Sequence, residues 1–288
     1  MLPPTLGGPF ATRWPVDDLA PDTTRIYYQV KVSFLKPSKT SAWSEPWATH
    51  TKNICVIPNF QEEPPIDMFG SRWHCTQKTK GVRKGFFSSQ SGTLTATVLQ
   101  PNPIHILGAG TEEYNCIHTS ATVKLCFIAK GNVNPPELQK IYSELQADTF
   151  YRITPWSDYP PWDLEDSFNR NGGHIFSSNL PLLKMSISSV LWATTSQSIN
   201  SQSNSRQSNS NCVELSDQSD GFTGHGRYYT ASISVPIILP KSKLFVPTFH
   251  TCFISRTYQL NLSMSYRQSI GSPIVSKLSL QVPIQVTA

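Results

Sequence analysis

Charged side chains are scarce in this chain, and the two signs nearly balance. Asp, Glu, Lys and Arg make up 15% of its 288 residues, whereas an average globular protein has about 25%. The net charge is only +5, and nucleic-acid-binding domains usually carry a denser basic surface. The composition therefore argues against nucleic acid as a partner.

Long apolar runs and targeting signals are also missing. No stretch approaches the roughly 18 consecutive apolar residues that a membrane-spanning helix requires. The first eight residues contain neither the basic region nor the apolar core of a secretion signal. The six cysteines are far apart and form no C-x-x-C pair, so we expect reduced thiols in a cytoplasmic protein.

Motifs of catalysis and metal binding are absent. The sequence has no G-x-S-x-G, no G-x-x-x-x-G-K-[ST] and no strand followed by G-x-G-x-x-G. Its seven histidines form no H-x-x-x-H pair, and zinc sites need repeated short spacings between ligands. Adjacent acids such as Glu62-Glu63 lie beside proline or glycine and are typical of solvated loops. We expect no enzyme activity, no cofactor and no metal.

Glycine is rarer than proline, with 15 Gly against 23 Pro, and proline disfavours long helices because it lacks the backbone N–H. What recurs instead is alternation of apolar and polar residues, which is typical of antiparallel strands with one buried face. Alternating runs begin at Ile26, Leu94, Ala121, Ala231, Tyr258 and Leu278. The segment 137–150 fits both a helix and a strand, and we interpret it as a strand. The pattern predicts an all-β protein of antiparallel β-sandwiches.

Composition also suggests where the chain divides. Residues 196–211 contain seven Ser, three Gln and four Asn, too little apolar surface to offset the entropy of ordering them. We predict a disordered loop at about 194–220. Gly108-Ala109-Gly110 marks the expected boundary between a first domain, residues 1–108, and a second, residues 109–288.

One basic cluster stands out within the first of these domains. Lys78, Lys80, Arg83 and Lys84 lie in a stretch with no acidic residue. The cluster fits a solvated loop, and it also fits a site for an anion or a phosphorylated tail.

A second candidate is the proline- and aromatic-rich segment 155–162. Its candidate partner-binding residues are Trp156, Tyr159, Pro160, Pro161 and Trp162. Proline-rich segments dock into aromatic grooves such as those of WW domains. The usual WW ligand is P-P-x-Y, which occurs nowhere in this chain. Packing of Trp156 and Trp162 over a sheet edge is the alternative.

Several spaced blocks resemble fungal arrestin-like proteins, including relatives of the Bul ubiquitin-ligase adaptors. They are Pro3-Pro4 followed by the strand 25–30; Val56-Ile57-Pro58 with Glu63-Pro64-Pro65; Arg83-Lys84-Gly85 with Gly92-Thr93-Leu94; Pro101 and Pro103; and residues 246–258. The last block, with its C-F-I-S-R-T-Y run, is the most specific. Together they cover most of the chain.

The resemblance implies a tandem pair of β-sandwich domains and a non-catalytic adaptor in membrane-protein trafficking or ubiquitin-dependent endocytosis. It implies cargo tails as partners and a WW-domain ubiquitin ligase, although no P-P-x-Y motif is present. It places the protein in the cytoplasm, recruited to the plasma membrane or endosomes, with at most peripheral membrane contact.

The chain departs from the family pattern at its start. It enters the first sandwich midway, so we expect that domain to be incomplete, with open strand edges and an uncovered apolar face. One alternative is a truncated or vestigial fragment without adaptor activity. Another is a secreted β-sandwich lectin, which would need disulfides and a signal peptide.

Overall fold

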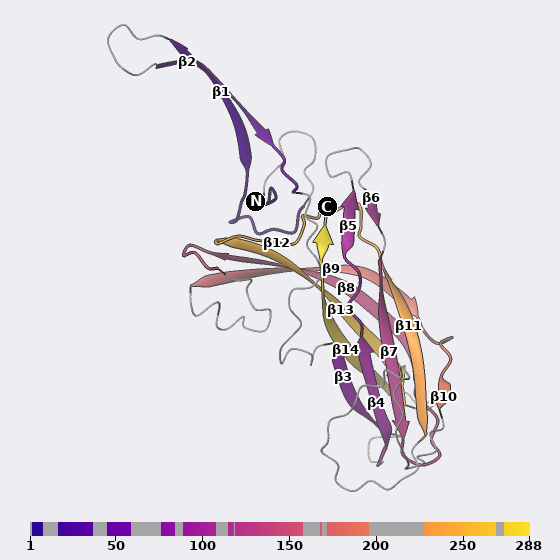
Figure 1. Ribbon diagram of the computed structural model, residues 1–288. Coiled ribbons are helices and arrows are strands. Elements are labelled where there is room, and N and C mark those ends of the chain that lie inside the picture. The colour runs from indigo at the N-terminus through magenta and orange to yellow at the C-terminus, as the bar shows by residue number, and fades with distance from the viewer. Residues whose placement is uncertain are drawn as a thin grey trace, which may run out of the picture.

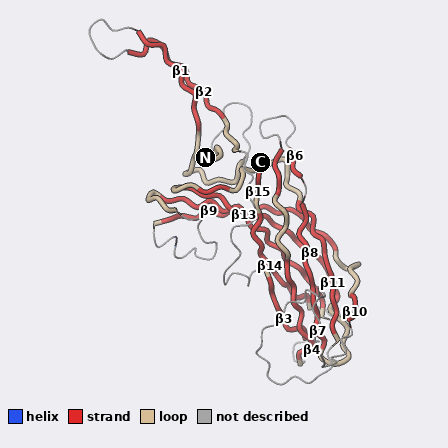
Figure 2. The backbone as a smooth tube through the Cα atoms, in the orientation of Figure 1, coloured by secondary structure: helices blue, strands red, loops and turns tan. Residues whose placement is uncertain are grey.

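In the computed structural model, the regular elements of the described residues are β-strands (Figures 1 and 2). The structure describes residues 2–7, 17–36, 45–58, 76–83, 89–107, 115–117, 119–157, 168, 172–195, 227–268 and 274–288. The prediction of an all-β protein is confirmed. The ambiguous segment 137–150 belongs to one long strand, β8 (Glu137–Arg152), as interpreted from the sequence.

Two antiparallel sheets form the body. The first has the strand order β10-β11-β7-β4-β3, with β10 (Ala193–Thr195), β11 (Tyr228–Ile237), β7 (Thr119–Ala129), β4 (Gln90–Val98) and β3 (Gln77–Arg83). The second has β13 (Ile254–Arg267) at its centre, with β8 and then β9 (Gly173–Ser186) on one side. β12 (Phe249–His250) and β14 (Val275–Ile284) pair with the other side of β13.

The core lies between these two sheets. Alternate residues of β4, β7 and β11 face it from the first sheet, and alternate residues of β13 and β14 face it from the second. This is what the period of two in the sequence requires, because successive strand side chains point to opposite faces. The fully buried members with the largest side chains include Phe127, Leu94, Leu145, Tyr258 and Tyr266.

Strand pairing crosses the domain boundary expected at residue 108. β4 precedes that boundary and β7 follows it, yet Leu94 pairs with Phe127 and Val98 with Val123 in one sheet. The residues of β3 and β4 thus share a core with residues 119–288. Gly92 shows how close the packing is, because a Cβ there would lie 2.4 Å from Cζ of Phe127.

A third, smaller sheet places the C-terminal strand beside the segment that connects β4 with β7. β15 (Val286–Thr287) pairs in parallel with β5 (Ile104–Leu107), which pairs with β6 (Asn115–Ile117). Beside it, Leu6 from the N-terminal segment forms a bridge with Ile26 and packs in a small separate core with Val246 and Phe249.

β1 (Tyr28–Lys36) and β2 (Glu45–Ile54) form a two-stranded hairpin that projects away from the body (Figure 1). The alternation in this segment predicts one buried face, but Val30, Val32 and Phe34 are all exposed. That expectation is wrong for this hairpin, because within the described residues no further strand pairs with it and no second layer covers it.

The first two residues of the loop predicted at 194–220 belong to a strand. Residues 193–195 form β10 and pair with Tyr228–Thr230 at the edge of the first sheet. The rest of that prediction, from residue 196 to residue 220, lies outside the described residues.

Candidate functional site

The basic cluster found in the sequence lies on β3, an edge strand of the body. Lys78, Lys80 and Arg83, here called the basic edge, all have exposed side chains, and Lys84 lies outside the described residues. β3 pairs only with β4, so its outer row of backbone groups has no strand partner in the described part of the chain. The cluster is therefore on a strand and not in a loop.

Two contacts tie the basic edge to the opposite sheet. The Nζ of Lys80 donates a hydrogen bond to the carbonyl oxygen of Lys277 on β14, at 3.1 Å. The backbone N–H of Arg83 donates to Oε1 of Gln268, at 3.1 Å. Lys78 and Lys80 are paired with the core residues Ala96 and Leu94, so their alkyl stems line the rim of the core while the ammonium groups stay in water.

On the described strands β3, β4, β13 and β14, the charge has one sign. Residues 68–111 and 221–288 contain no Asp or Glu, and these two ranges include β3, β4, β13 and β14. The nearest strand that carries an acid is β8, whose Glu137 pairs with Arg267. A positive field without acids raises the local concentration of anionic ligands.

An open strand edge with lysines can accept an extended chain. A peptide can add to such an edge through main-chain hydrogen bonds, and its acidic or phosphorylated side chains can then meet the basic groups. Lysines on an edge strand also discourage pairing between copies of the same protein. Both effects favour an anionic partner over self-association at β3.

The second sequence candidate is only partly described, and its described part is packed. Trp156 contacts Phe168 edge-to-face at 5.2 Å between ring centroids, and Phe168 contacts Phe150 in the same way at 5.6 Å. The guanidinium of Arg152 lies 5.9 Å from the Trp156 ring. Trp156 thus follows the packing alternative, while Tyr159, Pro160, Pro161 and Trp162 lie outside the described residues.

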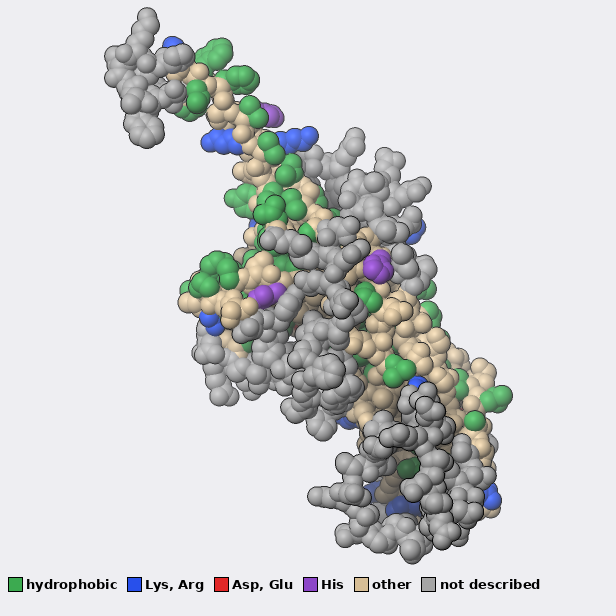
Figure 3. All heavy atoms as spheres, in the orientation of Figure 1, with side chains coloured by type: hydrophobic (Ala, Val, Ile, Leu, Met, Phe, Trp, Pro, Cys, Tyr) green, Lys and Arg blue, Asp and Glu red, His purple; other side chains and the backbone are tan. Residues whose placement is uncertain are grey.

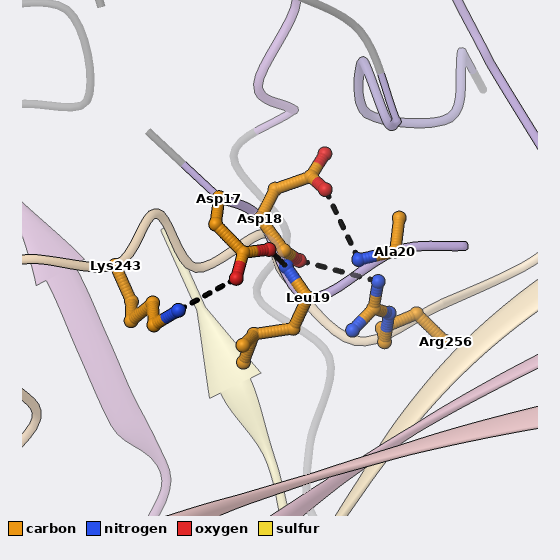
Figure 4. A network of polar contacts seen from close by, with 6 residues as sticks. All are labelled: Asp17, Asp18, Leu19, Ala20, Lys243 and Arg256. Carbon is orange, nitrogen blue, oxygen red and sulfur yellow. Dashed lines mark hydrogen bonds and ion pairs between the residues drawn. The ribbon is translucent and has the colours of Figure 1, made fainter. Parts of the chain in front are cut away.

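A buried arginine is the polar feature that the sequence reading missed. Arg256 on β13 is fully buried, and its Nη2 donates to the carbonyl oxygen of Asp18 at 3.3 Å (Figure 4). Within the described residues, its Nε and Nη1 have no hydrogen-bond partner. The alternation did indicate this burial, because Arg256 is two residues before Tyr258 and four before Leu260, and therefore lies on the same inward face of the strand.

Arg256 belongs to a network that fastens the segment 17–20 to the body. Lys243 forms an ion pair with Asp17 at 2.6 Å, and this contact lowers the pKa of the Asp17 carboxyl (Figure 4). The other carboxylate oxygen of Asp17 accepts the N–H of Leu19 at 2.8 Å. Asp18 in turn accepts the N–H groups of Gly7 and Ala20.

We expect Arg256→Met to leave the free energy of unfolding unchanged or to raise it. Methionine keeps the volume of the stem, and it removes two buried nitrogens that have no partner, which cost free energy in the native state. Denaturant unfolding of the variant and the parent protein measures this. A decrease of more than about 2 kcal/mol in the free energy of unfolding would contradict this expectation and show that the surroundings fully compensate the buried guanidinium.

The same part of the molecule contains a buried acid on the other face of the second sheet. Burial raises the pKa of Asp148 on β8, against hydrogen bonds from Ser177 and Gln146 and the charge of Arg256, which lower it. Asp148 is hydrogen-bonded to Gln146 at 2.9 Å. This group is satisfied by its own sheet and offers no free ligand.

The described ranges contain neither a metal-binding cluster nor a membrane-spanning helix. No three His, Cys, Asp or Glu side chains of those ranges are grouped so that they could hold a metal ion. Among the same residues no helix is long and apolar enough to cross a membrane.

The basic edge is thus the one sequence-derived site whose described residues remain exposed together on one element. Lys78 and Lys80 share a face of β3, and Arg83 follows at the end of the strand. Comparison with known proteins finds no family model that matches this chain and no similar curated protein. The arrestin resemblance stays a prediction.

Proposed function

We propose that this protein is a non-catalytic, arrestin-like adaptor that binds acidic or phosphorylated tails of membrane-protein cargo along β3. The observation that carries the proposal is the basic edge, a strand edge that has no outer partner in the described part of the chain, with exposed lysines and no acid on the described strands β3, β4, β13 and β14. An extended tail would gain main-chain hydrogen bonds from the strand and charge-assisted contacts from the lysines.

The resemblance supplies the rest of the proposal. The block at 246–258, its most specific part, runs through β12 and into β13, where Val246, Phe249 and Tyr258 are buried. An arrestin-like arrangement would make the body the second sandwich, and the hairpin β1–β2 part of the first one. Cytoplasmic location, recruitment to the plasma membrane or endosomes and delivery of a ubiquitin ligase belong to the same proposal.

A fragment without adaptor activity is the second candidate. The uncovered hairpin favours it, because an isolated two-stranded ribbon with exposed apolar residues is only marginally stable in water. The two candidates differ in one respect that can be measured, which is whether the basic edge binds a tail.

The test is peptide binding by fluorescence anisotropy with the full chain. We expect a multiply phosphorylated peptide to bind more tightly than its unphosphorylated form, and added salt to weaken binding because the contacts are exposed. The double variant Lys78→Glu/Lys80→Glu should bind about tenfold or more weakly, since two attractive contacts become repulsive.

A matched control carries the same charge change elsewhere. Lys140→Glu/Lys184→Glu alters two exposed lysines of the second sheet, on β8 and β9, and should retain parental affinity. Equal affinity of both double variants for the phosphopeptide would refute the basic edge as the binding site. Absence of binding by the parent protein would favour the fragment without adaptor activity.

A further inference from the structure

The hairpin β1–β2 presents apolar side chains to solvent along its whole length. Val30, Val32 and Phe34 lie on one face, opposite Lys52, His50 and Ala48 of β2. Green side chains line the projecting ribbon in Figure 3, with lysines between them. In the described part of the molecule neither outer edge of the ribbon is paired with another strand.

The apolar character is not uniform, and it increases away from the body. Near the body, the second face is polar, with a hydrogen bond between Gln29 and Asn53 at 2.9 Å and another between Ser33 and Thr49. At Phe34 and Leu35 both faces are apolar, just before the charged pair Lys36 and Glu45. Phe34 is 63% exposed, Leu35 on the opposite face is 60% exposed, and Trp47 is 81% exposed. Trp47 lies where the strand register shifts, beside the pair Leu35 and Pro46.

The charge of this region is strongly biased. Residues 23–61 contain five basic side chains (Arg25, Lys31, Lys36, Lys39 and Lys52) and one acid, Glu45, so 5 − 1 gives a net charge of +4. Acids flank this range on both sides, at Asp22 and at Glu62-Glu63, so the excess of positive charge is confined to the hairpin and its immediate neighbours. Its natural counterpart is an anionic surface.

We propose that the hairpin β1–β2 docks on an anionic lipid surface and places Phe34, Leu35 and Trp47 in the headgroup layer. Two observations favour lipid over a protein surface. A second copy would bring two segments of charge +4 together, which repel each other. A protein sheet would cover only one face of the ribbon. A lipid layer surrounds both faces of a ribbon end, and the exposed Phe34 and Leu35 lie on opposite faces.

The chemistry of the side chains fits the interface region of a bilayer. Tryptophan prefers the boundary between headgroups and acyl chains, and lysine keeps its charge at the headgroups while its stem lies on apolar surface. The unpaired N–H and C=O groups along both edges cannot enter the hydrocarbon, because nothing there satisfies them. Insertion therefore stops at the interface, and the hairpin does not span the membrane.

The experiment is flotation of the full chain with vesicles of phosphatidylcholine, with and without phosphatidylserine. We expect the protein to float with the phosphatidylserine vesicles and to be released by high salt, because basic residues and anionic lipid attract each other through a screened interaction. Phe34→Ser/Trp47→Ser should lower the bound fraction about tenfold. Lys31→Glu/Lys52→Glu should abolish the preference for phosphatidylserine.

The controls separate this inference from the proposed function, which uses other residues. Ile153→Ser/Leu191→Ser also removes two highly exposed apolar side chains, but from the body, and should bind vesicles like the parent protein. Lys78→Glu/Lys80→Glu should lose the phosphopeptide and keep the vesicles. All these side chains are exposed, so circular dichroism should show folded variants.

Three results would overturn the inference. The first is no flotation with phosphatidylserine vesicles. The second is equal flotation of the Phe34→Ser/Trp47→Ser variant and the parent protein. The third is a dimer in sedimentation equilibrium that this variant dissociates, which would show that a second copy covers the hairpin.

Discussion

Replacing Phe127 by alanine is expected to lower the free energy of unfolding by about 3–5 kcal/mol, as for other buried Phe→Ala changes. The ring is fully buried at the centre of the core, on the middle strand of the first sheet. It packs at 6.2 Å from the ring of Tyr229, and it presses so closely on Gly92 that no side chain fits there. Truncation leaves a cavity that this rigid sheet can fill only in part.

Denaturant unfolding followed by intrinsic fluorescence measures the loss. Phe34→Ala provides a matched control, because most of that ring is already in water; its effect should stay within about 0.5 kcal/mol. If both variants were equally destabilised, the hairpin would be as well packed in solution as the body. If neither variant were destabilised, Phe127 would not lie in a core that the two sheets share.

Alkaline pH is expected to destabilise the protein through Tyr258. Burial raises the pKa of this phenol to about 12 in the folded state, although the nearby charge of Arg256 and a hydrogen bond to Val246 oppose the shift. In the unfolded chain the group has its ordinary pKa of about 10. The unfolded state therefore loses its proton first as pH rises.

The sign of the effect follows from that order. Below pH 10 the tyrosine is protonated in both states, and its contribution to stability is fully present. Between about pH 10 and 12 the unfolded state ionises first, so the free energy of unfolding falls, in total by about 3 kcal/mol for a shift of about two pH units. Denaturant unfolding at a series of alkaline pH values measures this slope.

Tyr258→Phe isolates the group responsible. The variant should lose most of the alkaline slope, and it should be less stable at neutral pH by about 1 kcal/mol because the hydroxyl no longer donates to the carbonyl of Val246. A smaller slope should remain, since burial also raises the pKa of Tyr266. An undiminished slope in the variant would show that other groups cause the alkaline loss.

The core strands could be predicted because their pattern is local. Alternation in 94–98, 121–129, 231–237 and 258–266 places one apolar face on each strand, and each of these segments is a strand with that face buried. Strong alternation of this kind has few other solutions, because a helix would scatter the same residues around its axis. The exposure of Lys78 and Lys80 also followed from their charge.

The choice of partners could not be read from the same pattern. Nothing in β4 distinguishes pairing with β7 from pairing within residues 1–108, because any strand with an apolar face would satisfy it. The small residues Gly108 and Gly110 suggest a boundary, but β4, which precedes them, pairs with β7, which follows them, in one sheet. Backbone hydrogen bonds are the same for almost every residue type, so the sequence does not say which strands pair. The boundary predicted at residue 108 therefore falls between two paired strands of one sheet.

Local alternation by itself determined that this protein is all-β and which segments form its core strands, and charge indicated that Lys78, Lys80 and Arg83 are exposed. Only the tertiary structure decided which strands share a sheet, why Arg256 is buried and why the apolar face of β1 is not. A strand specifies that it has an apolar face, but what covers this face depends on segments far away in the sequence. For Arg256 that segment is Asp17–Ala20; for β1 the described chain provides none.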